Sequence, residues 1–234
     1  MTDFDLKIVM KILGSSGKRL GNIARCYQGE VNLTLHKKFL RKNRGSYAPM
    51  IKGAAIQRYL LLEHMSQGEI EFLDSHAFLK NNEAPKSKHH RVDRIVMQGI
   101  TGVNEHVRLK ATILGKGVFC GHSVNYITMK DNTYSKQYIL GMLNSKLYNW
   151  FFKLFSTNSN VNSYEVENLP IPPLNKSQEE IISLVDNIFS ITKGDDYLAS
   201  TIKQAEVKEY ERRIDQIIYG LYELTPKEIE VIES

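Results

Sequence analysis

Apolar residues recur at three- and four-residue intervals through residues 175–234, which is the spacing of amphipathic helices. Ser177 is a candidate N-cap here, and Glu180, three residues later, completes a capping box. Gly194 ends this first apolar pattern, as glycine commonly does at a helix C-terminus. A second helix is predicted over 197–221.

A third helix is predicted to begin after Thr225, which is followed by Pro226 at the first helical position. Glu228 makes another capping box with Thr225. Further upstream, the aromatic-rich stretch 134–155 has the same helical periodicity, and Ser135 is its candidate N-cap. The sequence therefore predicts a helical end preceded by one more helix.

The segments before residue 130 have a different pattern, because they are short, rich in β-branched residues and separated by glycines. Strands are predicted in 94–100, 107–114 and 118–129, with further short strands in 20–28 and 49–60. The Gly-Lys-Gly at 115–117 is predicted to be a hairpin turn. The predicted fold class is α+β: a small mixed or antiparallel β-sheet core with packed helices, followed by a C-terminal helical segment.

The stretch "ENLPIPPL" at 167–174 separates these two parts. Its prolines fix φ and donate no backbone hydrogen bond, so the strip is predicted to be extended and stiff, along a sheet edge. Apolar residues alternate with the prolines, which argues against a flexible linker or an exposed polyproline ligand. We expect two domains, 1–174 and 175–234, joined at this strip.

Charge divides the chain at the same place. Residues 1–174 carry 24 Lys and Arg against 13 Asp and Glu, a net +11, whereas residues 175–234 carry 7 against 13, a net −6. Positive charge concentrated in one part is the electrostatic footprint expected for a polyanionic partner. A solvated basic face produces the same pattern, so charge alone leaves both interpretations open.

Composition argues against a membrane or secreted protein. No run of about 18 apolar residues occurs, so no membrane span and no membrane partner are expected. Acidic residues precede the first apolar stretch, which does not fit a secretory signal peptide. Cys26 and Cys120 lie far apart and form no Cys-x-x-Cys pair, which favours buried, reduced thiols and a cytoplasmic location.

Two stretches match catalytic motifs only superficially. "GSSGKR" at 14–19 lacks the four residues between glycines and the Ser or Thr after lysine that a phosphate loop needs. "AEVKEY" at 205–210, after Asp195 and Asp196, has the D…ExK order of metal-dependent nucleases. That chemistry needs Glu206 and Lys208 on one strand face, whereas the local pattern is helical. We interpret both stretches as polar surface.

The adjacent histidines of "KSKHH" at 86–90 have no further Cys or His nearby to complete a zinc site, and the flanking lysines disfavour a cation. We interpret this stretch as a basic loop that enters a strand. No Ser-His-Asp elbow and no glycine-rich dinucleotide turn occurs. The sequence therefore predicts no catalytic residue, no metal site and no cofactor in this chain.

Four stretches resemble, in the same order, a known family of DNA-recognition domains. They are "LGNIARCYQGEVN" at 20–32, "MIKGAAIQRYLL" at 50–61, the strand-rich stretch 90–127, and 138–174, which holds an Asn-Ser pair and the closing proline phrase. Together they are similar to the TaqI-like C-terminal specificity domain, the target-recognition domain of restriction-modification DNA methyltransferases, as found in type IIG enzymes.

The resemblance implies that this chain recognises a DNA sequence in a bacterial restriction-modification system, while another part performs the chemistry. That part would be a DNA adenine-N6 methyltransferase that uses S-adenosylmethionine, often with a nuclease, in the same polypeptide or in a partner subunit. The expected partners are double-stranded DNA and this methyltransferase domain. We expect a piece of a longer enzyme, because type I specificity subunits usually carry two recognition domains.

Recognition of DNA requires two classes of residue. Lysine and arginine on basic loops are expected to contact phosphates. The candidates are Lys37, Lys38, Arg41, Lys42, Arg44, Lys86, Lys88, Arg91 and Arg94. Polar side chains on loops at sheet ends are expected to read base edges in the major groove. The candidates are Asn104, His106, Arg108, His122, Ser123 and Asn125.

Alternatives stay open at this point. Arg58, in the family-like segment, suits either DNA contact or a structural ion pair. The chain as a whole also suits a protein-interaction scaffold whose acidic helices bind a partner, or the specificity subunit of a multi-subunit system. A nuclease without a recognisable motif is a third possibility, which Mg²⁺-dependent cleavage by this chain alone would reveal.

Overall fold

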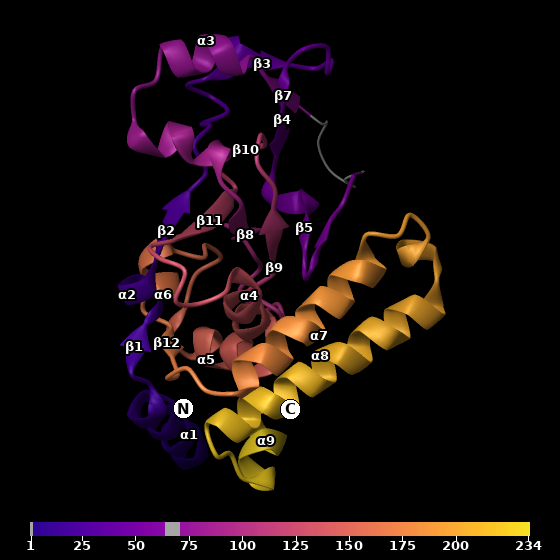
Figure 1. Ribbon diagram of the computed structural model, residues 1–234. Helices are drawn as coiled ribbons and strands as arrows, with labels where there is room; N and C mark the ends of the chain where they lie inside the picture. Colours follow the sequence, from indigo (N-terminus) through magenta and orange to yellow (C-terminus); the bar gives the residue numbers. More distant parts are fainter. Residues whose placement is uncertain (1, 64–70) are drawn as a thin grey trace.

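The computed structural model describes residues 2–63 and 71–234, and Figure 1 shows their arrangement. The chain begins with helix α1 (Asp3–Ser15), which the sequence-based interpretation does not include. Thr2 caps this helix: its hydroxyl accepts a hydrogen bond from the Asp5 amide, and the Asp5 carboxylate accepts one from the Thr2 amide. The pair of Thr2 and Asp5 was therefore a usable capping signal for this helix in the sequence.

An antiparallel sheet of order β2-β11-β8-β9 forms the centre of the molecule (Figure 1). Its strands are β2 (Ala24–Gln28), β8 (Arg94–Gln98), β9 (Ala111–Leu114) and β11 (Val124–Met129). On β8, Ile95 and Met97 belong to the large core cluster, whereas Val96 belongs to a separate cluster on the other face. Because both faces are covered, β8 is buried along nearly its whole length, and its three central residues are apolar.

A second four-stranded sheet, of order β10-β4-β7-β3, lies towards the end drawn at the top of Figure 1. Its strands are β3 (Leu40–Arg41), β4 (Ala48–Ile51), β7 (Glu71–Leu73) and β10 (Phe119–Cys120), with β10 parallel to β4. The short helices around it are η1 (Lys37–Phe39), η2 (Gly53–Ala55), α3 (Ser75–Lys80) and η3 (Pro85–Arg91). We call this sheet with η1, α3 and η3 the upper lobe.

The α+β fold class is confirmed and each predicted segment contains a strand, but 20–23 is helical and 118–129 holds two strands that belong to different sheets. The hairpin predicted at 115–117 is wrong. A turn does form there, and Gly117 adopts a φ of 86°. The turn leads out of the central sheet, because β10 pairs with β4 rather than with β9. The remaining short elements are β1 (Lys18–Arg19), α2 (Leu20–Ile23), β5 (Ile56–Gln57) and β6 (Leu60–Leu61), of which β5 and β6 form a hairpin.

The single helix predicted over 134–155 is two helices, α4 (Lys136–Asn144) and α5 (Lys146–Phe155). Ser135 caps α4, as predicted. The break is at Ser145, which has extended backbone angles and whose hydroxyl accepts a hydrogen bond from the Tyr148 amide. Serine is one of the residues that favour an N-cap over a helix interior, which accounts for the interruption.

Two asparagines beside this break hydrogen-bond to the edge of the central sheet. The Asn144 side chain exchanges two hydrogen bonds of 3.0 Å with the backbone of Ala111 on β9. The Asn149 carbonyl accepts from the amides of Arg108 and Leu109 at 2.8 and 2.7 Å. Strand β9 is at the edge of the sheet, and these buried side-chain amides pair with backbone groups at that edge. This role accounts for the asparagine of the Asn-Ser pair in the family-like segment.

The end of the chain is helical, as predicted. It contains α6 (Ser163–Glu167), α7 (Ser177–Thr192), η4 (Tyr197–Ala199), α8 (Thr201–Leu221) and α9 (Pro226–Glu233). The capping box between Thr225 and Glu228 is confirmed. The one predicted at Ser177 is wrong, because the Asn175 side chain accepts from the Ser177 amide and Ser177 lies inside the helix.

Helices α7 and α8 form an antiparallel hairpin against α4 (Figure 1). Ile181 and Val185 of α7, Ile214 of α8 and Ile139 of α4 are all buried in one core cluster. The apolar faces of the acidic end helices therefore pack on the part that precedes the prolines. The division into domains 1–174 and 175–234 stays a prediction.

The proline strip is extended, as predicted. Strand β12 (Pro170–Ile171) pairs antiparallel with β1, and the Leu20 amide donates to the Leu169 carbonyl at 2.8 Å. The buried Tyr148 hydroxyl donates to the Pro170 carbonyl. Leu169 and Ile171 are 2% and 1% exposed, so their side chains belong to the core.

We therefore expect residues 167–174 to resist proteolysis in the native chain, because a protease needs an unpaired, accessible backbone. Limited digestion followed by mass spectrometry measures this. The exposed stretch 102–106 serves as the internal reference, and cleavage is expected there first. Cleavage within 167–174 as early as in 102–106 would restore the flexible-linker interpretation.

Candidate nucleic-acid interface

Most of the predicted phosphate contacts lie on the upper lobe. Lys37 and Lys38 are on η1, Lys42 and Arg44 are on the segment between β3 and β4, and Lys86, Lys88 and Arg91 are on η3. All seven are exposed except Lys86, which is half-buried. Burial, followed by the charge of the neighbouring Lys86, lowers the pKa of His36, which places η3 near the residue that precedes η1. The fold thus gathers basic segments that are separate in the sequence.

Arg41 is partly committed to the fold. Its guanidinium pairs with the Asp74 carboxylate at 3.2 Å and donates to the carbonyls of Lys38 and Leu40 at 2.8 and 2.9 Å. It also lies over the Tyr47 ring, 5.3 Å from the centroid. Asp74 in turn caps α3 by accepting from the Ala77 amide. Arg41 therefore joins β3 to α3, and its edge towards solvent is the part that a phosphate would reach.

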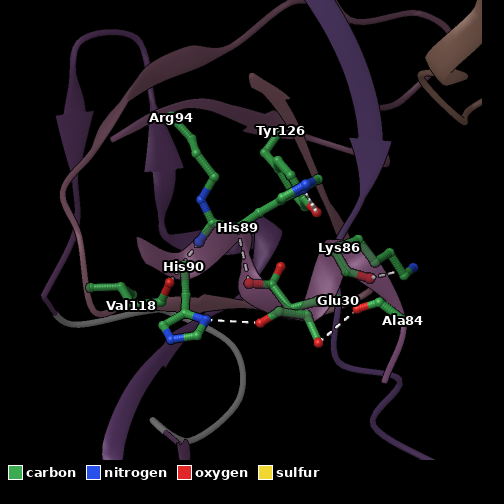
Figure 2. Close-up of polar contacts among 10 residues, drawn as sticks. Glu30, Ala84, Lys86, His89, His90, Arg94, Val118 and Tyr126 are labelled. Atoms are coloured by element: carbon green, nitrogen blue, oxygen red, sulfur yellow. Dashed lines mark hydrogen bonds and ion pairs between the residues drawn. The ribbon is translucent and has the colours of Figure 1, made fainter. Parts of the chain in front are cut away.

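Polar and aromatic contacts fix the inner side of the basic segment η3, and Figure 2 shows some of the polar ones. The Ser87 hydroxyl donates to the Ala84 carbonyl at 2.7 Å, and His90 Nδ1 lies 2.8 Å from the Ser87 carbonyl. The His90 ring stacks on Phe119, with 4.3 Å between centroids. These contacts turn the histidines inward and leave Lys88 and Arg91 exposed.

Arg94 does not lie on this surface, which corrects its sequence-based assignment as a phosphate contact. Its side chain is fully buried and pairs with the equally buried Glu30 carboxylate at 2.9 Å (Figure 2). It also donates to the Val118 carbonyl at 2.6 Å and lies over the Tyr126 ring, 4.5 Å from the centroid. A buried arginine with an internal counter-ion is not available to DNA.

His122 and Ser123, two of the predicted base readers, lie in the turn between β10 and β11. The His122 amide donates to the Val31 carbonyl at 3.0 Å. The Ser123 hydroxyl accepts from the Gly53 amide at 2.9 Å, so it is partly satisfied inside the protein. A Cβ on Gly53 would lie 2.5 Å from the Ser123 carbonyl, which explains why the family-like segment has glycine there.

His122 lies beside the basic segments. Its ring is half-buried, and burial, followed by the charges of Lys86 and His36, lowers its pKa. A lowered pKa keeps the imidazole neutral at neutral pH, when it can both donate and accept a hydrogen bond. His122 is therefore a neutral hydrogen-bonding side chain that lies next to a lysine of the basic segment η3.

Two other predicted base readers are buried, which corrects their assignment. Arg108 is 0% exposed: its Nε donates to the Thr101 hydroxyl at 2.8 Å and its Nη2 to the Asn158 carbonyl at 2.7 Å. Asn125 is 4% exposed and donates to the Val161 carbonyl. Both side chains fix the segment after α5 against the central sheet and are structural.

The last two predicted base readers are exposed but are not gathered around His122. Asn104 and His106 lie in the segment between β8 and β9. His106 borders a cavity that Trp150 of α5 and Val231 of α9 also line. Figure 1 shows α9 at the opposite end from α3, so His106 faces away from the upper lobe.

Arg58 forms the structural ion pair that the sequence left as one alternative. Its guanidinium contacts the Glu211 carboxylate of α8, and both side chains are mostly buried. The following residue, Tyr59, accepts at its carbonyl a 3.0 Å hydrogen bond from the Thr192 hydroxyl of α7. The family-like segment at 50–61 therefore attaches the β5–β6 hairpin to the end helices.

Two residues near the site were missed by sequence reasoning. Gln28, exposed at the end of β2, donates from its amide to the His122 carbonyl at 3.1 Å. His36 Nδ1 accepts from the Asn32 amide at 3.0 Å, which orders the turn before η1. The position of Gln28 at a strand end was a usable signal. No signal in the sequence indicated His36, because its neighbour Lys86 is far away in the sequence.

Four further observations concern the part of the chain that the structure describes. No cluster of His, Cys, Asp or Glu there suits a metal ion, and no helix there is long and apolar enough to cross a membrane. Glu206 and Lys208 lie on helix α8, so they do not share a strand face. Cys26 and Cys120 are free and buried, as predicted.

A family model described as the TaqI-like C-terminal specificity domain matches residues 48–171, just over half of the chain. The chain therefore belongs to this family, whose members are target-recognition domains of restriction-modification enzymes. No curated protein sequence matches the chain.

Solved structures support the same fold. The type IIL restriction-modification enzyme MmeI, solved in complex with DNA, superimposes with a TM-score of 0.60 at 11% identity, over 92% of this chain and 35% of MmeI. The type IIG restriction endonuclease BpuSI superimposes with a TM-score of 0.50 at 12% identity, over 93% of this chain and 33% of BpuSI. The chain thus spans about one third of the length of these enzymes.

Proposed function

We propose that this chain binds double-stranded DNA through its upper lobe and reads a specific sequence for a catalytic part outside the chain. The observation that carries the proposal is that the basic segments η1 and η3, separate in the sequence, meet beside the half-buried His122, whose pKa is lowered first by burial and then by the charges of Lys86 on η3 and of His36 next to η1. Separate basic segments on one lobe suit the phosphates of a duplex, and a neutral imidazole between them suits a base edge.

The lysines and arginines of the lobe would set the position of the duplex by contacting phosphates, which carry no sequence information. Lys37, Lys38, Lys88 and Arg91 are the exposed candidates on η1 and η3. His122 would make the direct base contact, and Gln28 is the second candidate, since an amide suits adenine in the major groove. Buried Arg94, Arg108 and Asn125 would act only by holding these elements.

The catalytic partner would be a DNA methyltransferase of the adenine-N6 type, and S-adenosylmethionine would bind to that partner. The family assignment supports this proposal. We place the whole assembly in the bacterial cytoplasm, where buried free thiols such as Cys26 and Cys120 stay reduced.

Replacing Lys86, Lys88 and Arg91 together by alanine is expected to weaken DNA binding to all sequences. Each lost phosphate contact lowers the slope of log affinity against log salt by about 0.9, so the slope should fall by about 2 to 3. Fluorescence anisotropy with a mixed-sequence duplex of about 30 base pairs, titrated over a salt series, measures this.

The matched control is the triple variant Lys176→Ala, Lys193→Ala and Lys227→Ala. It removes the same charge from exposed positions on the end helices, so it should leave the slope unchanged. If both triple variants lower the slope equally, the effect is one of net charge and the lobe is not the binding surface. Salt-insensitive behaviour of the wild-type chain would instead favour the interaction-scaffold interpretation.

A further inference from the structure

The buried pair of Arg94 and Glu30 lies beside the basic segment η3, whose residues Lys86, His89 and His90 are drawn around it in Figure 2. Both side chains are 0% exposed. Taking two charges out of water costs several kcal/mol per ion, and a hydrophobic pair of similar volume is often as stable or more stable. Stability alone therefore does not account for this pair.

The pair is also incompletely satisfied. Among the residues that the structure describes, Glu30 Oε2 and Arg94 Nε are buried atoms without a hydrogen-bond partner. Burial accordingly raises the pKa of the Glu30 carboxyl, against the opposing effect of the Arg94 charge. An unsatisfied buried polar atom costs about 1–3 kcal/mol, so the arrangement is retained at a cost.

A short series of contacts connects this pair to η3. The Arg94 guanidinium lies 4.5 Å from the centroid of the Tyr126 ring, and the Tyr126 hydroxyl lies 3.0 Å from His89 Nδ1 (Figure 2). Tyr27 packs against both the His89 and Tyr126 rings, at 4.8 and 5.5 Å between centroids. Beside Glu30, the Gly29 carbonyl accepts from Lys86 Nζ at 3.5 Å.

Because η3 is a 3₁₀ helix, these contacts on its inner side determine the direction in which its exposed basic side chains point. Residues three apart eclipse one another in such a helix, so Lys88 and Arg91 lie one above the other. His89 on Tyr126 and His90 on Phe119 fix the rotation of η3 about its axis. Any rotation that frees the histidines would also turn Lys88 and Arg91 away from their present direction.

Resting on the proposed DNA contact of η3, we propose that Arg94, Glu30 and Tyr126 are positioning residues. They do not touch DNA. They hold η3 in one rotation through His89, so that Lys88 and Arg91 face the phosphates together. The lowered pKa of His89, caused first by burial, keeps its ring neutral, and a neutral ring can form the hydrogen bond between Nδ1 and the Tyr126 hydroxyl in either tautomer.

Two variants test this role without removing a basic residue of the surface. Tyr126→Phe keeps the ring under Arg94 and removes only the hydroxyl that holds His89. The double variant Glu30→Leu with Arg94→Met replaces the ion pair by an apolar pair of similar length. Tyr210→Phe is the control, because it removes a tyrosine hydroxyl that contacts Glu206 on α8, away from the upper lobe.

We expect both variants to free η3. Amide hydrogen exchange in 86–91 should become at least about tenfold faster, and the salt slope of duplex binding should fall by about 1 to 2, as contacts of Lys88 and Arg91 are lost. Tyr210→Phe should change neither. The unfolding temperature of Tyr126→Phe should lie within a few degrees of that of the wild type. A change in its salt slope would then not be due to loss of the folded state.

The outcomes separate the two proposals. If Tyr126→Phe leaves both the hydrogen exchange in 86–91 and the salt slope unchanged, the positioning role is overturned. This single variant decides the question even if the double variant does not fold. If the triple variant of Lys86, Lys88 and Arg91 lowers the slope in the same experiment, the proposed function survives that failure. A wild-type chain without salt-dependent binding overturns both.

Discussion

Replacing Gly29 by alanine is expected to destabilise the chain by about 3 kcal/mol or more, at the upper end of what overpacking costs. A Cβ at this position would lie 2.0 Å from the Gly121 carbonyl oxygen and 2.6 Å from that of Cys120. Both obstacles are backbone atoms, so no side-chain rotation relieves the contact. Either β2 or the turn before β11 must move.

Hydrogen bonds on each side make such a movement costly. The Gly29 amide donates to the Val124 carbonyl at 2.8 Å, and the Val31 amide to the Cys120 carbonyl at 3.0 Å. On the other side, the Gly121 amide donates to the Ile51 carbonyl at 2.9 Å. Relief of the contact would break at least one of these bonds and displace His122.

Chemical denaturation followed by circular dichroism measures the loss of stability. Gly220→Ala is the control, because a Cβ there meets no atom within 4 Å and position 220 lies inside helix α8. Alanine favours a helix interior over glycine by about 1 kcal/mol, so this control should be neutral or stabilising. Equal stability of Gly29→Ala and the wild type would show that the approach of β2 to this turn is looser than described.

Replacing Asp215 by asparagine is expected to stabilise the chain above pH 6, by up to about 3 kcal/mol. Asp215 is 4% exposed on α8, and burial raises its pKa to about 6 from an ordinary 3.8. Its Oδ1 accepts from the Lys146 amide at the start of α5, at 2.8 Å. An asparagine carbonyl keeps this hydrogen bond and carries no charge.

The sign of the effect follows from the raised pKa. The folded state holds the Asp215 proton more tightly than the unfolded state does, so stability is fully present below about pH 4 and is lost as the pH rises through about 6. The gain from Asp215→Asn should therefore be small near pH 4 and complete by about pH 8.

The prediction is tested by measuring the denaturant midpoints of Asp215→Asn and of the wild type at about pH 4.5, 6 and 8. Asp195→Asn, which removes a carboxylate from an exposed position, is the control and should show no such trend. A stability difference for Asp215→Asn that is constant with pH would mean that the Asp215 carboxylate titrates normally in the folded chain.

Local patterns predicted most of the elements, and the predicted helix boundaries were wrong where two local signals compete. Thr225 with Glu228 has no rival and caps α9. Ser177 has a rival in Asn175, whose side chain accepts from the Ser177 amide and moves the start of the helix. Ser145 interrupts a continuous apolar periodicity, because its capping hydrogen bond outweighs the continuation of the helix.

The site was predictable only in part, because exposure depends on partners that are distant in the sequence. Lys88 and Arg91 are exposed on a basic segment that precedes a strand, as predicted, but this segment is the 3₁₀ helix η3 and not a loop. Arg94, three residues later, looked the same in the sequence. Its burial depends on Glu30, 64 positions away, and no local pattern joins the two. The pairing of charges inside the fold therefore decided which of these basic residues remain exposed.

The most direct test of DNA recognition is photo-cross-linking of the chain to a pool of duplexes with randomised sequence, because covalent capture also retains weak complexes. Sequencing of the captured DNA and mass spectrometry of the linked peptides give the two readouts. We predict one enriched sequence motif and cross-links within 28–44, 86–91 and 122–123. Captured DNA without an enriched motif, with cross-links spread over α7 and α8, would contradict sequence recognition by the upper lobe.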